Sequence, residues 1–343
     1  MSSRLDHNDG DTIPWWHFDV KFPDTNGRYT NADWERHRSW FRYWLEPRIF
    51  VLVVLNMLPF LTWVTVVTVA LTLYYELGQL QHENWLVVVS RDYNQPFILT
   101  SFALALLLVF RTNSAYERWW SARKHFGQMY NDCRSIARFT MNWIAPNNPV
   151  IAAVIMRLTS MLGPASCSYL QGDVSTTSIF NQLVVHSTIT PEEYNLIASS
   201  EQPPITIMLL ISDLLQKAGD ELRVFERITI EERLVSYQIE LGCLERIKNQ
   251  PIYIPYTRQT SRFLLLYMTF LPFSLVAYCS WASIAVVPCL AFLLVGIENI
   301  GIHAENPMET LPIAALAASS KSTVDIIWRT GESKPYRDFI ASL

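Results

Sequence analysis

The chain has 343 residues, of which 50% are hydrophobic and 13% aromatic, and its formal net charge at pH 7 is −4. The 27 basic residues form no dense block, which argues against a nucleic-acid-binding surface. The five cysteines are widely spaced and include no CxxC pair, so they indicate neither a disulfide framework nor a zinc ribbon.

The first 47 residues mix acidic, basic and aromatic side chains. They lack the basic-then-apolar layout of a signal peptide and the acid-poor composition of a transit peptide. We therefore expect residues 1–47 to form a cytosolic N-terminal arm, followed by a single domain over residues 48–343.

Three uncharged runs indicate a membrane protein. Residues 49–74 exceed the roughly 20 residues that a helix needs to cross a bilayer. Residues 263–297 are long enough for two tightly connected spans, and residues 95–110 are a shorter candidate. Buried core helices of a soluble protein are the weaker alternative, because two of the runs are too long for them. The sequence thus predicts four membrane spans, at residues 49–74, 95–111, 263–279 and 284–300.

The distribution of basic residues predicts the topology. Arginines and lysines gather before the first and third spans and after the second and fourth, while the connection after the first span carries only one permanent base, Arg91. Cytosolic loops are enriched in such residues. Both termini, the helical region 112–262 and the segment 301–343 are therefore expected in the cytosol. The plasma membrane is the expected location, with an organellar membrane as the alternative.

The second span is predicted to begin a long helix. Asn94 is a suitable N-cap, and Gln95-Pro96 place a proline in the first turn. No proline or glycine lies between Thr112 and Phe126, so the helix should continue into the cytosol. Its uncharged part reaches only about 24 Å, which suits a helix that lines a water-filled path better than one that faces lipid.

The cytosolic region reads as helices with short breaks, and an all-α fold is predicted. Residues 150–170 are apolar but contain Arg157, and Gly163-Pro164 are expected to break the helix. We interpret this segment as a buried cytosolic helix, with a fifth span as the alternative. Thr190-Pro191 followed by two acids marks a helix start, and Pro251 should end a long amphipathic helix.

No motif for catalysis or metal binding is present in the sequence. HExxH, GxGxxG, Walker and GxSxG patterns are all missing, so we expect no enzyme activity, no metal and no cofactor. The predicted spans contain no charged or histidine side chain in their interiors, and Glu298 falls at the cytosolic end of the fourth. Pumps and coupled transporters place ionisable groups there. A passive pathway or a scaffold is therefore favoured.

Phe102, Leu106 and Phe110 recur every four residues and form one stripe on the second span. The stripe has two interpretations. It can pack against neighbouring helices, or it can form a ring of apolar side chains around a symmetric pore that closes by dewetting.

The segment "PFILTSFALALLLVFRTNSAYERWWSARKHFG" resembles the bestrophin family. "LPFSLV" at residues 271–276 is similar to the family's third-span signature, and "ENPMETLPI" at residues 305–313, which contains Asn306 and Pro307, is similar to the stretch after the fourth span. The resemblance covers about residues 40–330. The positions that match the main motif are Phe110, Arg111, Thr112, Asn113, Tyr116, Arg118, Trp119, Ala122 and Arg123.

This resemblance implies a homopentameric ion channel whose central pore is lined by the second helix. The family's hydrophobic neck corresponds to the Phe102–Leu106–Phe110 stripe, and the N-termini at Asn94–Pro96 would surround the outer entrance. A second, cytosolic constriction corresponds to Ile205 or Thr206. Eukaryotic members conduct chloride and other monovalent anions, while bacterial relatives can be cation-selective. A non-channel helical scaffold or carrier is the remaining alternative.

Two departures place the chain closer to plant, fungal and bacterial relatives than to the calcium-activated animal members. The calcium clasp of the animal members needs several carboxylates, but only Glu309 lies between Met308 and Leu311. Calcium activation is therefore not expected. The neck also has Leu106 where animal members have phenylalanine, which leaves its width open.

Overall fold

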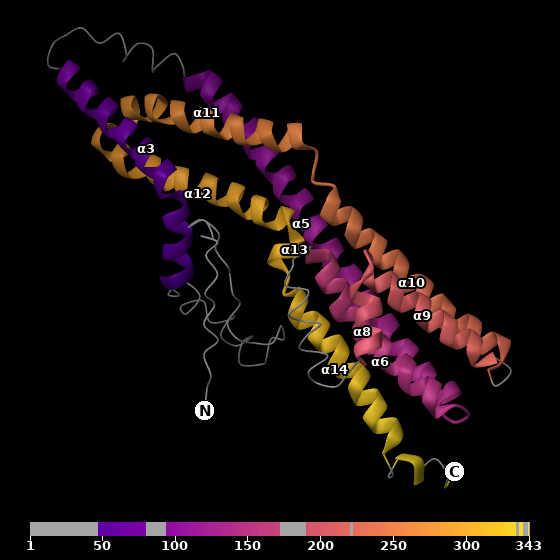
Figure 1. Cartoon of the computed structure of the whole chain (residues 1–343). Coiled ribbons are helices and arrows are strands. Elements are labelled where there is room, and N and C mark those ends of the chain that lie inside the picture. Colours follow the sequence, from indigo (N-terminus) through magenta and orange to yellow (C-terminus); the bar gives the residue numbers. More distant parts are fainter. Residues whose placement is uncertain are drawn as a thin grey trace, which may run out of the picture. The chain divides into compact units, whose positions relative to one another are not determined.

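All regular secondary structure in the described residues is helical (Figure 1). The computed structural model describes residues 47–79, 94–171, 190–219, 222–333, 336–338 and 342. The predicted all-α fold is confirmed for this part of the chain. The predicted N-terminal arm lies outside the described residues, except for Pro47 at its end.

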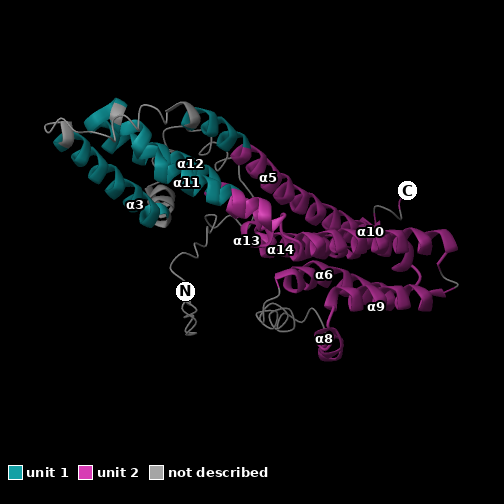
Figure 2. Cartoon of the chain, turned by 90° about the horizontal axis from the view of Figure 1, so that it is seen from above, with its two compact units in different colours: residues 1–106, 260–298 teal, residues 107–259, 299–343 magenta. Residues whose placement is uncertain are grey.

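The chain divides into two compact units, which Figure 2 distinguishes by colour. Unit 1 comprises residues 1–106 and 260–298, and unit 2 comprises residues 107–259 and 299–343. Three helices, α5, α11 and α12, contribute residues to both units. The helices of unit 1 are α3 (Pro47–Gln79), the first part of α5 (Asn94–Phe139), most of α11 (Ile254–Cys279), the short 3-10 helix η3 (Ser280–Ala282) and most of α12 (Ser283–Glu305).

Unit 2 contains the remainder of α5 and a bundle of further helices. A π-helical turn, η1, follows α5 directly. The other elements are α6 (Pro149–Gln171), α8 (Pro191–Ala198), α9 (Pro203–Lys217), α10 (Val224–Asn249), α13 (Pro307–Thr310) and α14 (Ile313–Glu332), with η1 covering Thr140–Ile144.

Several helix ends lie where the sequence predicted them. Helix α5 begins at Asn94 and continues without interruption to Phe139, so the predicted passage from an apolar to a charged segment is one continuous helix. At the start of α8, Thr190 and Glu193 form a reciprocal capping box. Helix α10 ends at Asn249, two residues before Pro251.

The predicted spans 49–74, 95–111, 263–279 and 284–300 lie within α3, α5, α11 and α12. Among the described residues, four segments are long and apolar enough to cross a membrane: Met57–Leu77, Phe97–Ile144, Pro149–Gln171 and Ser280–Glu305. This set includes α6 and omits α11. Burial sets α6 apart from the other three segments. In α6, 72% of the most apolar stretch is buried, whereas the value for the other three is 17–22%. By contrast, α11 exposes Leu265, Leu266 and Phe270, as a helix in contact with lipid does.

Unit 1 is held by apolar packing and by a few internal hydrogen bonds between hydroxyl groups and helices. The Oγ1 of Thr72 and the Oγ of Ser283 lie 3.0 Å apart in a fully buried contact that joins α3 to α12. The rings of Phe97 and Tyr267 stack with centroids 4.3 Å apart and join α5 to α11. Hydroxyl contacts of this kind hold helices together in a bilayer, where the hydrophobic effect between helices is weak.

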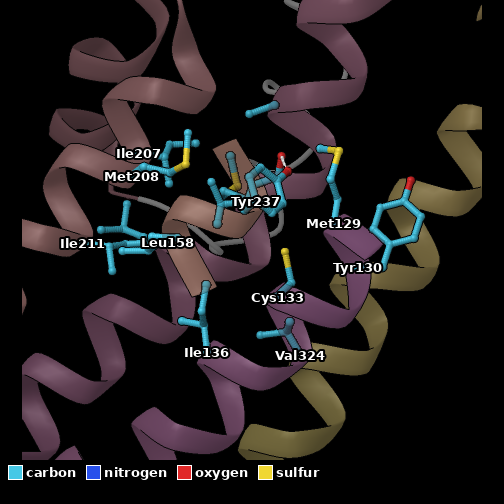
Figure 3. Close-up of a cluster of buried hydrophobic side chains, with 14 of the residues drawn as sticks. Met129, Tyr130, Cys133, Ile136, Leu158, Ile207, Met208, Ile211, Tyr237 and Val324 are labelled. Carbon is cyan, nitrogen blue, oxygen red and sulfur yellow. Dashed lines mark hydrogen bonds between the residues drawn. The ribbon is translucent and has the colours of Figure 1, made fainter. Parts of the chain in front are cut away.

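The core of unit 2 is shown in Figure 3. Buried side chains such as Cys133 of α5, Leu158 of α6, Ile211 of α9 and Val324 of α14 form one hydrophobic cluster. The Tyr237 hydroxyl donates to the carbonyl of Leu162 at 2.9 Å inside this cluster. Burial raises the pKa of Tyr237 well above its ordinary value, so the phenol stays a neutral donor.

The expected break at Gly163-Pro164 is wrong, because α6 runs through both residues. A proline inside a helix costs about 3 kcal/mol, and here the packing of α6 against α9 and α14 compensates for it. Gly163 has a packing role in this contact, since a Cβ atom there would lie 3.3 Å from the Cβ of Ser320 on α14. The expectation that this helix is buried is confirmed, as the helix buries 72% of its most apolar stretch.

Ser280, at the corner between α11 and α12, has a φ of 44° and is the one non-glycine residue with positive φ in the described chain. Left-handed backbone costs an L-residue about 1–2 kcal/mol. Ser280→Gly should therefore raise the free energy of unfolding by about 0.5–1 kcal/mol, because the Ser283 hydroxyl can still bond to the carbonyl of residue 280. Thermal unfolding in detergent measures this. Ser135→Gly, inside α5, should instead lower the free energy of unfolding. A lower stability of Ser280→Gly would contradict the argument.

Candidate pore helix and its anchoring residues

The three residues of the predicted neck are exposed on α5. Phe102 is 74% exposed, Leu106 45% and Phe110 54%, whereas Leu104 and Leu108 on the other side of the helix are buried. Phe102 and Leu106 belong to unit 1, and Phe110 belongs to unit 2. Large apolar side chains exposed over two turns of a membrane helix must face lipid or an apolar pathway. The side chains of residues 94–96 at the predicted outer entrance lie outside the described residues.

Ile98 was missed by the sequence analysis. It lies four residues before Phe102 and is 57% exposed, so it extends the same stripe by one turn. The four-residue spacing from Phe102 could have identified Ile98 from the sequence.

Arg111, the first charged residue after the stripe, is buried. It is only 5% exposed, and it lies near enough to Glu305 and Tyr256 for both to interact with its charge. The Tyr256 hydroxyl also donates to the carbonyl of Leu107, at 3.3 Å. A buried guanidinium needs such partners because its desolvation is costly. Arg111 therefore anchors α5 within unit 2.

Arg118 binds the ends of two other helices. Its Nε donates to the carbonyl of Glu305, the last residue of α12, at 2.9 Å. Its two Nη atoms donate to the carbonyls of Gln250, at 2.6 Å, and of Ile247, at the end of α10. The last carbonyls of a helix lack partners within the helix and carry partial negative charge. One guanidinium thus satisfies the C-terminal ends of α10 and α12 together.

These contacts bring two of the family-like motifs together. Arg111 and Arg118 come from the motif on α5, and Glu305 immediately precedes Asn306 and Pro307 of the other motif. Asn306 is exposed and its carbonyl accepts from Thr310 N–H, while Pro307 is buried at the start of α13.

Tyr116 and Trp119 of the motif on α5 make aromatic packing contacts. Tyr116 is 56% exposed, and its ring centroid lies 6.2 Å from that of Trp119, which packs against the core cluster. Asn113 is exposed and Arg123 is half-buried.

The two candidates for the cytosolic constriction are half-buried on α9. Ile205 packs against the core cluster, and the Thr206 hydroxyl donates to Ser200 Oγ at 2.7 Å. Leu209, one turn further on, is 61% exposed and is the large apolar side chain that this helix presents outward. The sequence did not indicate Leu209. Ile205 packs against the core and Leu209 is exposed, and this difference depends on neighbours that are distant in the sequence.

A further polar contact joins α5 to α10. Nδ1 of His125 lies 2.5 Å from Oε2 of Glu240, and Nε2 of His125 lies 3.1 Å from the Oγ of Ser121. Serine, histidine and carboxylate in this order also occur in hydrolases. Here Ser121 lies inside a continuous helix, whose backbone N–H groups are used by the helix and cannot stabilise an oxyanion. The contact therefore connects two helices. In the described ranges, no group of three or more His, Cys, Asp or Glu residues is placed to hold a metal ion.

Arg118 provides a test of the anchoring role. Arg118→Lys leaves one compact ammonium to face three carbonyls, so the free energy of unfolding should fall by about 2–4 kcal/mol. Thermal unfolding in detergent measures the change. Arg329→Lys, at an exposed arginine of α14, should leave the stability unchanged. If Arg118→Lys unfolds at the same temperature as the unmodified protein, Arg118 is not an anchor.

A family model described as "Bacterial/Fungal Bestrophin protein" matches residues 33–325. The chain is 30% identical over 237 residues to a voltage-dependent anion channel-forming protein of Nostoc sp., covering 66% of this chain and 75% of that protein. It is 27% identical over 321 residues to the chloroplastic voltage-dependent chloride channel 2 of Arabidopsis thaliana, covering 91% and 76%.

The fold is similar to that of solved structures as well. The crystal structure of a bacterial bestrophin homologue from Klebsiella pneumoniae superposes with a TM-score of 0.68 at 20% sequence identity, covering 78% of this chain and 96% of the other. At this identity the likeness concerns the fold.

Proposed function

This chain belongs to the bacterial/fungal bestrophin family, and on that premise we propose that it forms a passive channel for chloride and other monovalent anions. The observation that carries the proposal is the exposed apolar stripe on α5, where Phe102 is 74% exposed and Phe110 54%. The stripe stands on a helix that continues unbroken into a charged segment. A pore helix needs this combination, because a dry constriction must open into a wet vestibule.

The proposed neck conducts by a physical mechanism that needs no charged ring. Large apolar side chains around a pore exclude water when they are close together and admit it when they separate. An ion that crosses must shed part of its hydration shell. The helix has no ionisable residue between Gln95 and Phe110, so nothing in this segment binds the ion tightly and slows its release.

Anion preference follows from two features of the same helix. The N-terminal ends of five copies of α5, beginning at Asn94, would point partial positive charge at the outer entrance. The edges of the Phe102 and Phe110 rings carry the positive side of the aromatic quadrupole. Together these features favour weakly hydrated anions. The names of the Nostoc and Arabidopsis relatives, an anion channel-forming protein and a chloride channel, support the same choice.

We propose a homopentamer with four spans per subunit, with both termini and the helical region 112–262 in the cytosol. The plasma membrane is the proposed location. Ile205 or Thr206, with the exposed Leu209 nearby, would form the cytosolic constriction.

The neck is tested by truncating its side chains. Phe102→Ala combined with Leu106→Ala should widen the constriction and raise single-channel conductance or the open probability. Recordings from the purified protein in planar bilayers measure both. Leu266→Ala with Phe270→Ala is the matched control, because it removes the same two residue types at the same spacing from exposed positions on α11. Currents of the neck variant that equal those of the unmodified channel would reject the assignment.

Ion selectivity and assembly are tested on the unmodified protein. Under a KCl gradient the reversal potential should lie close to the equilibrium potential of chloride. A value near that of potassium would favour the cation-selective alternative. Light scattering in detergent should give a protein mass five times the 39.6 kDa of one chain. A monomer or dimer is incompatible with a five-fold pore and would favour a scaffold or carrier.

A further inference from the structure

In unit 2, one line of exposed side chains follows α5 from the end of the neck to the end of the helix. Phe110 begins it and is 54% exposed. The residues that follow recur at spacings that keep them on one side of a helix of 3.6 residues per turn. They are Asn113, Glu117, Trp120, Lys124, Arg134 and Arg138, all of them exposed.

The line becomes basic beyond the neck. It carries Lys124, Arg134 and Arg138 against a single acid, Glu117. In the part of the chain that the structure describes, no carboxylate forms an ion pair with any of these three cations.

Arg134 and Arg138 each contact a neutral group. The guanidinium of Arg138 lies 4.6 Å from the centroid of the Phe139 ring. Nη1 of Arg134 lies 3.5 Å from Oδ1 of Asn131. Neither contact cancels the positive charge, and both guanidinium groups remain accessible to solvent.

Two other arginines of unit 2 form ion pairs. Arg157 pairs with Glu193 at 3.0 Å, and Arg233 lies 3.7 Å from the buried carboxylate of Asp132. Among the described residues, these two arginines have carboxylate partners, whereas Lys124, Arg134 and Arg138 have none. Charges that hold no structure together and lie in phase with the neck are placed to act on mobile ions.

We propose that Lys124, Arg134 and Arg138 concentrate chloride and other monovalent anions at the cytosolic entrance of the neck. The proposal rests on the proposed channel function, because five copies of α5 around one axis turn each position into a ring of like charges. Rings of arginine and lysine are a recurring device of anion pores. A confined path lined by charge of one sign also raises the local concentration of the opposite ion.

The positions of these residues decide which property they affect. Lys124 lies about 21 Å along the helix axis from Phe110, well beyond the Debye length of about 8 Å at physiological ionic strength. The three cations are therefore too distant to change the energy of an ion inside the neck. They act by supplying anions to it, so they should increase the anion current that enters from the cytosolic side. Glu117, only about 10 Å from Phe110, opposes them.

The experiment combines Lys124→Gln, Arg134→Gln and Arg138→Gln in the full chain. Single-channel recordings in planar bilayers at about 0.1 M KCl should show the anion current from the cytosolic side reduced at least about twofold, with a smaller change from the other side. At about 1 M KCl, where the Debye length is about 3 Å, the difference from the unmodified channel should disappear. Glu117→Gln should change the current in the opposite direction.

Two controls separate charge from structure. The charge-conserving variant Lys124→Arg with Arg134→Lys and Arg138→Lys should behave as the unmodified channel. Arg329→Gln removes an exposed charge of α14 and should also have no effect. A triple glutamine variant that matches the unmodified channel at low salt, or a reduction that persists at high salt, overturns the proposal. An unmodified channel that carries no anion current overturns the proposed function itself, and this inference with it.

Discussion

A helix that leaves a membrane without a break must satisfy two solvents with one continuous surface. Helix α5 does so over 46 residues, with an apolar exposed face as far as Phe110 and a charged one beyond it. Every backbone group in its apolar part must be bonded within the helix, because hydrocarbon offers no partner. In unit 2, α6 makes the most extensive helix–helix contacts, with α14 and α9, and α5 adds side chains such as Cys133 and Ile136 to the same core.

Contacts made by the first charges after the apolar stretch hold this helix in place. Arg111 is buried beside Glu305, and Arg118 binds the terminal carbonyls of α10 and α12. The two arginines therefore act directly after the apolar stretch of α5, and they join this helix to the ends of α10 and α12. The contacts of both arginines are structural, and neither residue belongs to the proposed neck.

Local sequence patterns were sufficient for elements whose ends are set by backbone chemistry. The start of α5 at Asn94, the capping box of Thr190 and Glu193, and the end of α10 before Pro251 depend on residues within a few positions of one another. The same reasoning failed at Gly163-Pro164. There the local cost of a proline is outweighed by packing against α9 and α14, which lie far away in the sequence. The neck and the cytosolic constriction remain predictions.

The sequence by itself determined the membrane class, the continuity of α5, the phase of its apolar stripe and the family, because composition and helical spacing are local properties. Only the tertiary structure decided that α6 is a core helix, that Arg111 is buried while Lys124 and Arg138 stay exposed, and that Arg118 closes two helix ends. These outcomes depend on which distant segments reach each side chain. Neighbours that are distant in the sequence determine whether a charged side chain is buried, and therefore whether its desolvation must be compensated by partners. Spacing along the chain does not reveal these neighbours.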